Sequence, residues 1–294
     1  MKYITSRDSR SGEEVKISYA DYGKGIPVVL IHGWPLNKHM WEYQVNDLVD
    51  AGFRVIKYDR RGFGFSDKPW DGYDYDTLTD DLHALMAELG LHDAVLVGFS
   101  MGGGEVVRYL SKYGSDRVSK IVLISSIIPY MLKTDDNPDG IDASVFDDIQ
   151  QGLKKDRIGF LDEFGKKFFG VSLVKKPISH PLLDYYLQQC SIASPRATKK
   201  CAESFATTDF RKDLENIHVP VLIIHGDEDK TVPIESSSAI TAKKIPGALY
   251  KIYEGAPHGL FYTEKEQLNE DLIHFIKEGE LVGELETESS SGRK

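Results

Sequence analysis

A serine lies between two glycines where an extended segment is expected to turn into a helix. The motif is Gly98-Phe99-Ser100-Met101-Gly102, which follows the apolar run AVLVG and precedes the helical run GGGEVVRYL. A nucleophile on such a turn needs small residues two positions before and after it, because the backbone there packs closely against its neighbours. The free N–H groups of the following helix would also face a developing oxyanion. Ser100 is therefore the candidate nucleophile.

A second Gly-Phe-Ser triplet, at residues 64–66, differs from the first in its surroundings. Asp67 follows it, so the second small residue is missing. The triplet also continues a polar Asp-Arg-Arg-Gly run at residues 59–62, and no helix is expected to start at its serine. We expect a structural turn there, with Arg60 and Arg61 in ion pairs.

A serine hydroxyl needs a base to take its proton and a carboxylate to orient that base. Of the nine histidines, His258 alone lies in a loop flanked by glycine and proline after the last strand-like run, ALYKIYEG. His258 is therefore the candidate base. His32 and His225 end other strand-like runs, and we expect them to fix loops through hydrogen bonds.

Three acids follow the strand-like run VLIIHG and compete for the orienting role. They are Asp227, Glu228 and Asp229. The carboxyl ends of strands are where open α/β sheets build their sites, and the chain order serine, acid, histidine suits this architecture. We favour Asp229, with Asp227 hydrogen-bonded to its own turn.

The segment His32-Gly33-Trp34-Pro35 ends the strand-like run PVVLIH. A second oxyanion donor is expected from this loop, beside the N–H that follows the nucleophile. The backbone N–H groups of Trp34 and Met101 are the predicted pair. Pro35 restricts Trp34 to extended conformations and so fixes the direction of the Trp34 carbonyl.

Alternating strands and helices must position these residues. Most strand-like runs are apolar throughout, as parallel strands covered on both faces require. Between them lie amphipathic segments such as residues 75–91, with leucines at three- and four-residue spacing. From about residue 129 the strand pattern gives way to an aromatic, helical segment, and strands return at 219. This pattern predicts an α/β fold with a mostly parallel, doubly wound sheet and an inserted helical cap.

The predicted division follows from that interruption. The core is expected to comprise residues 1–129 and 216–280, the cap residues 130–215, and a polar, disordered tail residues 281–294.

Composition narrows the classes of function. The 294 residues carry a formal net charge of −10, which disfavours a general binder of nucleic acid or of anionic membranes. No apolar run is long enough to span a bilayer, and the N-terminus lacks the apolar core of a signal peptide.

Cys190 and Cys201 lack metal-site spacing and are expected to be free thiols in a reducing, cytoplasmic location. The acidic loop at residues 135–140 lacks the glutamate that a calcium loop needs, so no metal or other cofactor is expected.

Taken together, the motifs resemble those of a known family. The runs HGWPLNKHMW, YDRRGFGFSDKPWDGY, VGFSMGGGEVVRY, HGDEDKTVP and GAPHGL are similar to those of the α/β-hydrolase superfamily. More narrowly, they resemble the cofactor-free haloperoxidases, which are also described as perhydrolases or aryl esterases, over about residues 15–280. The resemblance implies a Ser100, Asp229 and His258 triad, with Asp229 matching as the second aspartate of HGDED. It also implies that the Trp34 carbonyl, followed by proline, accepts a hydrogen bond from peroxide.

A pocket beneath a cap needs an apolar lining, and aromatic residues of the inserted segment are suited to it. The expected lining residues are Pro35, Phe99, Met131, Phe146, Phe160, Phe164, Phe205 and Val232.

The leading hypothesis is a hydrolase of small aryl or short-chain carboxylic esters. It would form an acyl-Ser100 that water or hydrogen peroxide releases. Hydrolases of carbon–carbon bonds or lactones remain open alternatives, as does a slow-turnover ligand receptor on the same fold. Neither nucleic acid nor a membrane is an expected partner, and a homo-oligomer is left open. A nicotinamide dinucleotide site is disfavoured, because the first strand–turn lacks G-x-G-x-x-G.

Overall fold

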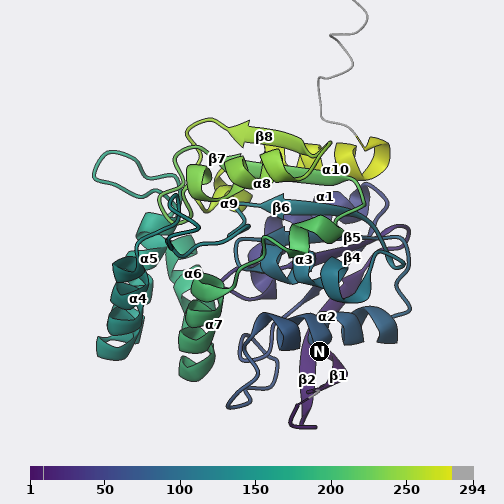
Figure 1. The fold of residues 1–294 in the computed structure, drawn as a ribbon, viewed down its shortest axis with the longest axis horizontal. Coiled ribbons are helices and arrows are strands. Elements are labelled where there is room, and N and C mark those ends of the chain that lie inside the picture. The colour runs from purple at the N-terminus through teal and green to yellow at the C-terminus, as the bar shows by residue number, and fades with distance from the viewer. Residues whose placement is uncertain (9, 280–294) are drawn as a thin grey trace, which may run out of the picture.

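The computed structural model describes residues 1–8 and 10–279, and within them a single sheet of eight strands forms the centre of the molecule (Figure 1). The strand order is β1-β2-β4-β3-β5-β6-β7-β8. The strands are β1 (Lys2–Arg7), β2 (Glu14–Tyr22), β3 (Pro27–Ile31), β4 (Arg54–Tyr58), β5 (Ala94–Phe99), β6 (Val118–Ile124), β7 (Val221–Gly226) and β8 (Leu249–Tyr253).

Helices cover both faces of this sheet. In Figure 1, α2, α3 and α8 lie in front of the sheet and α1 and α10 behind it. The helices are η1 (Lys38–Trp41), α1 (Glu42–Asp50), α2 (Tyr75–Glu88), α3 (Gly102–Tyr113), α4 (Ala143–Lys155), α5 (Arg157–Phe168), α6 (His180–Ser191), α7 (Pro195–Thr207), η2 (Asp213–Asn216), η3 (Ile234–Ser236), α8 (Ser238–Lys244), α9 (Leu260–Thr263) and α10 (Lys265–Glu278).

The strand sequences explain the pairing. Every residue of β5 and of β7 is buried, and the strands from β4 to β8 pair in parallel. Because both faces of β5 and β7 are covered, these two central strands are largely apolar and show no alternation of buried and exposed positions. The predicted doubly wound, mostly parallel sheet is confirmed. The sequence analysis missed β1, an antiparallel edge strand whose exposed and buried positions alternate through the polar run KYITSR.

Four α-helices, α4 to α7, lie between β6 and β7 in the chain. Each begins where a short polar side chain accepts a hydrogen bond from a backbone N–H of the first turn, which favours a helix start at that point. These capping residues are Asp142, Asp156, Ser179 and Ser194. In Figure 1 the four helices stand together at one end of the molecule, beside the carboxyl ends of the central strands.

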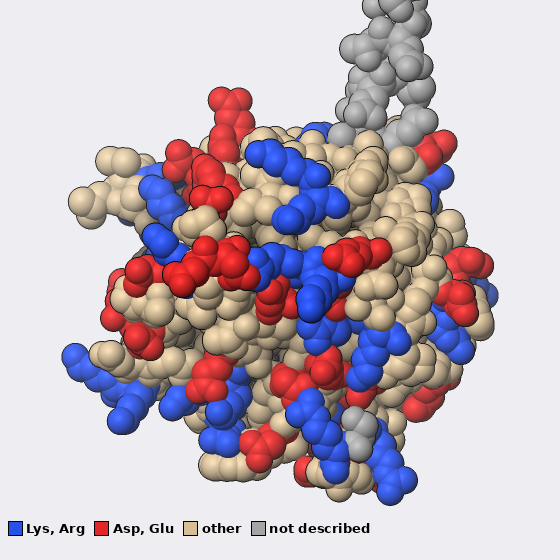
Figure 2. Space-filling view, viewed as in Figure 1, with Lys and Arg blue, Asp and Glu red and all other residues tan. Residues whose placement is uncertain are grey.

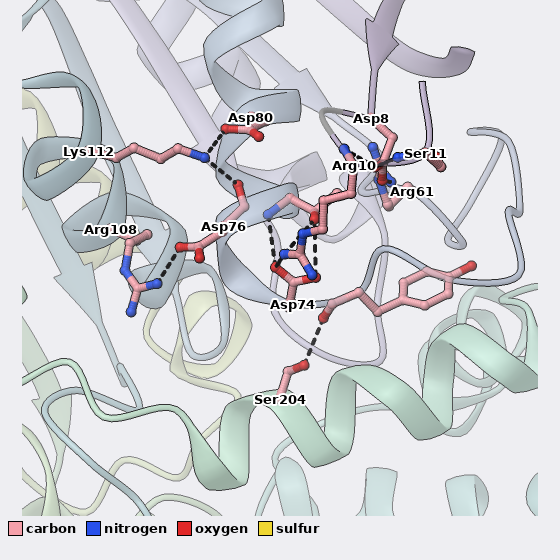
Figure 3. Close-up of polar contacts among 12 residues, drawn as sticks. Asp8, Arg10, Ser11, Arg61, Asp74, Asp76, Asp80, Arg108, Lys112 and Ser204 are labelled. Atoms are coloured by element: carbon pink, nitrogen blue, oxygen red, sulfur yellow. Dashed lines mark hydrogen bonds and ion pairs between the residues drawn. The ribbon is translucent and has the colours of Figure 1, made fainter. Parts of the chain in front are cut away.

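Polar contacts attach α7 to the start of α2. Asp74 caps α2 by accepting a hydrogen bond from the Thr77 N–H, and Arg10 pairs with the same carboxylate. Ser204 on α7 donates to the Tyr73 carbonyl at 2.8 Å, one residue before that cap (Figure 3). The inserted helices are therefore fixed to the core by hydrogen bonds as well as by apolar packing.

The two arginines before the second Gly-Phe-Ser triplet form buried ion pairs, as predicted. Arg60 binds Glu105 on α3, and the Arg61 guanidinium contacts Asp81 on α2 at 2.6 Å. The Ser66 hydroxyl donates to a backbone carbonyl at 2.6 Å and is buried. The triplet is therefore a structural turn.

Charge is dispersed over the surface despite the net value of −10. On the face shown in Figure 2, basic and acidic side chains are interspersed rather than gathered into one patch of a single sign. Among the described residues, no helix is both long and apolar enough to cross a membrane.

Candidate active site

The turn from β5 into α3 holds Ser100 in a left-handed backbone conformation, with φ of 53°. A non-glycine residue rarely adopts this conformation, and such strain is concentrated at functional sites. The flanking glycines are required by close contacts. A Cβ atom at Gly98 would lie 2.6 Å from the Gly102 carbonyl oxygen, and one at Gly102 would lie 2.6 Å from that of Ile31. The turn therefore needs both glycines.

Three loops at the carboxyl ends of β5, β7 and β8 bring together the predicted serine, acid and base. Ser100 Oγ lies 3.0 Å from His258 Nε2, and His258 Nδ1 lies 2.6 Å from Asp229 Oδ2. All three side chains are buried. In this arrangement the imidazole can take the hydroxyl proton while the carboxylate stabilises the resulting cation.

Asp229 is held by four groups. Its Oδ1 accepts hydrogen bonds from the N–H groups of Thr231 and Val232, both at 2.8 Å. Its Oδ2 contacts His258 and also lies 3.1 Å from His225 Nε2. Burial alone would raise the pKa of the Asp229 carboxyl, but the two imidazoles outweigh burial and hold that pKa well below its usual value. The carboxylate is therefore ionised wherever the protein is folded near neutral pH.

His225 is a contact of Asp229 that the sequence analysis missed. Its Nδ1 lies 2.6 Å from Ser238 Oγ, and its Nε2 lies 2.9 Å from the Val232 carbonyl oxygen. Because a carbonyl accepts, Nε2 carries the proton and Nδ1 accepts from the serine hydroxyl. The predicted loop-fixing role is confirmed. The available signal was its spacing of four residues from the acid.

His32 also fixes a loop, as predicted. Its Nδ1 donates to the Gly33 carbonyl at 2.8 Å, and its Nε2 accepts from the Arg60 N–H at 3.0 Å. Complete burial, together with the nearby Arg60 guanidinium, holds the pKa of His32 well below its usual value. A neutral imidazole therefore supports the loop that leads to Trp34.

The sequence analysis predicted that Asp227 is hydrogen-bonded to its own turn, and this prediction was wrong. Asp227 Oδ1 accepts a hydrogen bond from the Gly255 N–H at 2.6 Å, in the loop after β8, rather than from its own turn. The strands β7 and β8 pair in parallel, so their following loops lie side by side and can exchange this bond. Glu228 is exposed and lies 3.7 Å from Lys230. Of the three competing acids, Asp229 is the one that contacts His258.

The predicted oxyanion donors lie in the loops after β3 and β5. Among the described residues, no protein acceptor takes a hydrogen bond from the backbone N–H of Trp34 or of Met101. Their surroundings are fixed: the Trp34 indole donates to the Thr198 carbonyl on α7 at 2.8 Å, and the Tyr75 hydroxyl donates to the Met101 carbonyl at 3.0 Å. Both N–H groups are thus available to a developing oxyanion.

A cavity of about 460 Å³ opens above Ser100 and His258. Its walls come from the core and from the inserted helices, and they are mainly apolar. The following predicted residues line it: Met131, Phe146, Phe160, Phe164, Phe205 and Val232. Further lining residues that were not predicted are Ile127 and Ile141, which lie in loops, and Val145 and Ile149 of α4. Nothing in the sequence of an aliphatic residue separates a position that lines a cavity from one that lies in the core.

Two expected lining residues lie elsewhere. Phe99 is fully buried beneath the site, and its ring centroid is 5.0 Å from that of His258. Consecutive strand residues point to opposite faces, so Phe99 at the end of β5 supports the imidazole from the core. Pro35 instead lines a small separate cavity among residues of α5 and α6, and Phe164 contributes to the walls of both cavities.

The two cysteines are unreactive, and no metal-ligating cluster is found in the described part of the chain. Cys190 and Cys201 are free and buried, and burial raises the pKa of each thiol to about 12. Residues 1–8 and 10–279 contain no group of three or more His, Cys, Asp or Glu side chains that could hold a metal ion.

The family model of the alpha/beta hydrolase fold matches residues 26–265. A non-heme chloroperoxidase of Kitasatospora aureofaciens is 41% identical over 278 residues, covering 94% of this chain and 99% of that protein. A bifunctional esterase/perhydrolase of Acinetobacter calcoaceticus is 40% identical over 280 residues, covering 94% and 100%.

The fold has solved counterparts. A crystal structure of bromoperoxidase from Bacillus anthracis superposes with a TM-score of 0.90 and 47% identity, covering 94% of this chain and all of that one.

Proposed function

Since the chain belongs to the alpha/beta hydrolase fold family, we propose that it is a serine hydrolase of small carboxylic esters that also transfers acyl groups to hydrogen peroxide. The observation that carries the proposal is the hydrogen-bonded series from Ser100 through His258 to Asp229 beneath an apolar cavity. Support for the two acceptors comes from a relative named as an esterase/perhydrolase and from one named as a chloroperoxidase.

Acylation begins when His258 removes the Ser100 proton and the serine oxygen attacks the ester carbonyl carbon. The N–H groups of Trp34 and Met101 stabilise the negative oxygen that forms, and one such donor is worth about 10²- to 10³-fold in rate. His258 then gives the proton to the leaving alcohol or phenol, whose bond to the acyl carbon breaks. Asp229 stays ionised throughout.

Deacylation repeats these steps with a second nucleophile. Water releases a carboxylic acid, whereas hydrogen peroxide releases a peracid, and His258 accepts the proton of either nucleophile. The peracid oxidises halide after leaving the site, which accounts for haloperoxidase chemistry without a bound cofactor.

The cavity supports aryl and short acyl substrates. Its volume of about 460 Å³ suits a small molecule, and its phenylalanines offer apolar faces for an aromatic ring. The helices that supply these faces belong to residues 130–215, which act as a cap on a core formed by residues 1–129 and 216–280. The predicted tail, residues 281–294, lies outside the described residues. The two unpaired cysteines accord with a reducing, cytoplasmic location.

The test is hydrolysis of a chromogenic aryl acetate together with labelling by a fluorophosphonate. The wild-type chain should turn the ester over, and digestion should place the phosphonyl group on the peptide that contains Ser100. Ser100→Ala should abolish labelling and lower kcat by several orders of magnitude. Label on Ser66, or full turnover in Ser100→Ala, would overturn the assignment. Labelling without turnover of any ester would indicate a ligand receptor.

A further inference from the structure

Lys57 lies on β4, remote in sequence from every residue of the candidate active site. Only 6% of its surface is exposed. Its side chain nevertheless lines a surface cavity of about 480 Å³ beneath α1. The other lining residues are Tyr22 of β2 and, from one side of α1, Glu42, Val45, Asn46, Val49 and Asp50. The amine therefore reaches solvent through a defined opening.

The Lys57 amine has no partner. Within residues 1–8 and 10–279 it makes neither a hydrogen bond nor an ion pair, although buried lysines are almost always paired. Lys38, a nearby lysine that is equally buried, shows the usual solution, because its Nζ binds the Asp59 carboxylate and the Ser18 hydroxyl. Of these two buried lysines, only Lys57 is thus without a protein partner for its amine, which faces the cavity.

The surroundings disfavour the charged form of Lys57. Burial, and next the positive charge of Lys38, lower its pKa to about 8, against the smaller opposing effects of Glu42 and Asp59. His39 also lies near the amine, but burial lowers its pKa, which favours the neutral imidazole. At pH 7.5 about a quarter of such amines are neutral, compared with about 0.1% for an ordinary lysine.

We propose that Lys57 is a nucleophilic modification site that takes acyl groups from activated acyl donors such as thioesters and aryl esters. The nitrogen lone pair attacks the carbonyl carbon, and the bond from that carbon to the leaving sulfur or oxygen breaks. The amine proton goes to solvent, and an amide remains. The cavity of about 480 Å³ admits a short acyl group, and the amide that forms is neutral, which the poorly solvated surroundings favour over the ammonium ion. This site is independent of the Ser100 chemistry.

The experiment is competitive acetylation of the full-length Ser100→Ala chain, so that the candidate active site does not consume the reagent. Less than one equivalent of N-hydroxysuccinimidyl acetate is added at pH 7.5, and the acetylated lysines are quantified by peptide mass spectrometry. We expect Lys57 to react at least tenfold faster than exposed Lys24, and paired Lys38 to remain unmodified. Glu42→Gln should raise the Lys57 rate about twofold, because it removes a charge that favours the ammonium form.

The outcomes are distinct. Labelling of Lys57 at or below the rate of Lys24 would overturn the proposal, as would labelling that appears only in denaturant. Lys57→Arg keeps the charge but lacks the nucleophilic amine, so it should lose the modified peptide. Introduced into the wild-type chain, with Ser100 intact, Lys57→Arg should leave ester turnover at the wild-type level, and this comparison separates the modification site from the proposed esterase function.

Discussion

His225 Nε2 lies 3.1 Å from Asp229 Oδ2, the same oxygen that the catalytic-base candidate contacts from the other side. Two imidazoles thus share one carboxylate oxygen, and the remaining oxygen is occupied by two backbone N–H groups. Every rotation of Asp229 would break at least one of these contacts. The acid is fixed before substrate binds.

His225→Phe removes one donor and should raise the pKa of Asp229. We expect kcat to fall about tenfold to hundredfold, since a typical hydrogen bond to a charged group contributes about 1.5–3 kcal/mol. The acid side of the profile of stability against pH should also move to higher pH, because Asp229 then protonates more readily. His225→Gln restores a donor and should recover part of the loss. Equal losses in both variants, with no change in profile, would assign His225 a purely structural role.

Asp229→Asn should lower kcat by about 10⁴-fold, because the amide favours the wrong tautomer of His258. Asp227→Asn is the matched control. Asp227 lies two residues from Asp229, and its carboxylate accepts a hydrogen bond from the Gly255 N–H rather than contacting His258. The Asp227→Asn variant should change kcat little and lower the free energy of unfolding by about 1 kcal/mol. Steady-state kinetics and urea unfolding of both variants measure this. If Asp227→Asn abolished turnover instead, the roles of the two aspartates would be exchanged.

The depressed pKa of Asp229 also predicts how stability depends on pH. The folded-state pKa lies below the ordinary value of 3.8, so the carboxylate stabilises the fold at any pH above that value. This contribution is lost as the pH falls toward the folded-state pKa. Urea unfolding should therefore show that the free energy of unfolding falls more between pH 6 and pH 3 in the parent than in Asp229→Asn. Equal losses would contradict the direction of the shift.

The buried Arg60–Glu105 pair should show strong coupling. Arg60→Met or Glu105→Leu alone leaves an unpaired buried charge and should cost about 3–5 kcal/mol of unfolding free energy. The double variant should cost much less than the sum, because no charge remains. Since Arg60 also donates to the His32 carbonyl at 2.7 Å, each single variant should weaken turnover as well. Additive costs in a double-mutant cycle would rule out coupling.

Pro35 is expected to bias deacylation toward hydrogen peroxide. After one oxygen of hydrogen peroxide attacks, its second oxygen still carries an O–H that can donate a hydrogen bond to the Trp34 carbonyl. Water has no second oxygen and therefore no O–H in that position. One such bond is worth about 0.5–1.5 kcal/mol, or a threefold to tenfold preference. Pro35→Leu should therefore lower the ratio of peracid formation to hydrolysis for one ester at fixed peroxide. An unchanged ratio, with both rates reduced, would make Pro35 a structural residue alone.

Local sequence was sufficient to predict the sheet and the position of Ser100. An apolar run predicts a buried strand, and the glycines on either side of Ser100 predict a tight turn. Both patterns extend over only a few residues, so they can be recognised from the sequence alone. The relation between Ser100, Asp229 and His258 also followed, since parallel strands deliver their carboxyl ends to one edge.

Side-chain direction and contacts between loops were beyond such reasoning. Phe99 and Ser100 are neighbours, yet they point to opposite faces because of strand geometry. The contact between His225 and Asp229 depends on how the intervening turn folds back. The Asp227 bond depends on the loop after β8, which lies far away in the sequence.

The pairing of β6 with β7 has a consequence for how this architecture can diversify. These strands are direct neighbours, with Ile121 opposite Val221, although four α-helices separate them in the chain. The chain leaves the sheet after β6 and returns to it at the neighbouring strand β7. The inserted helices α4 to α7 could therefore be replaced by another segment without a change in the sheet. Such a segment could reshape substrate choice without altering strand order or the reacting groups. The hydrogen bond from the Trp34 indole to Thr198 sets one condition, because a replacement must present a carbonyl at that point.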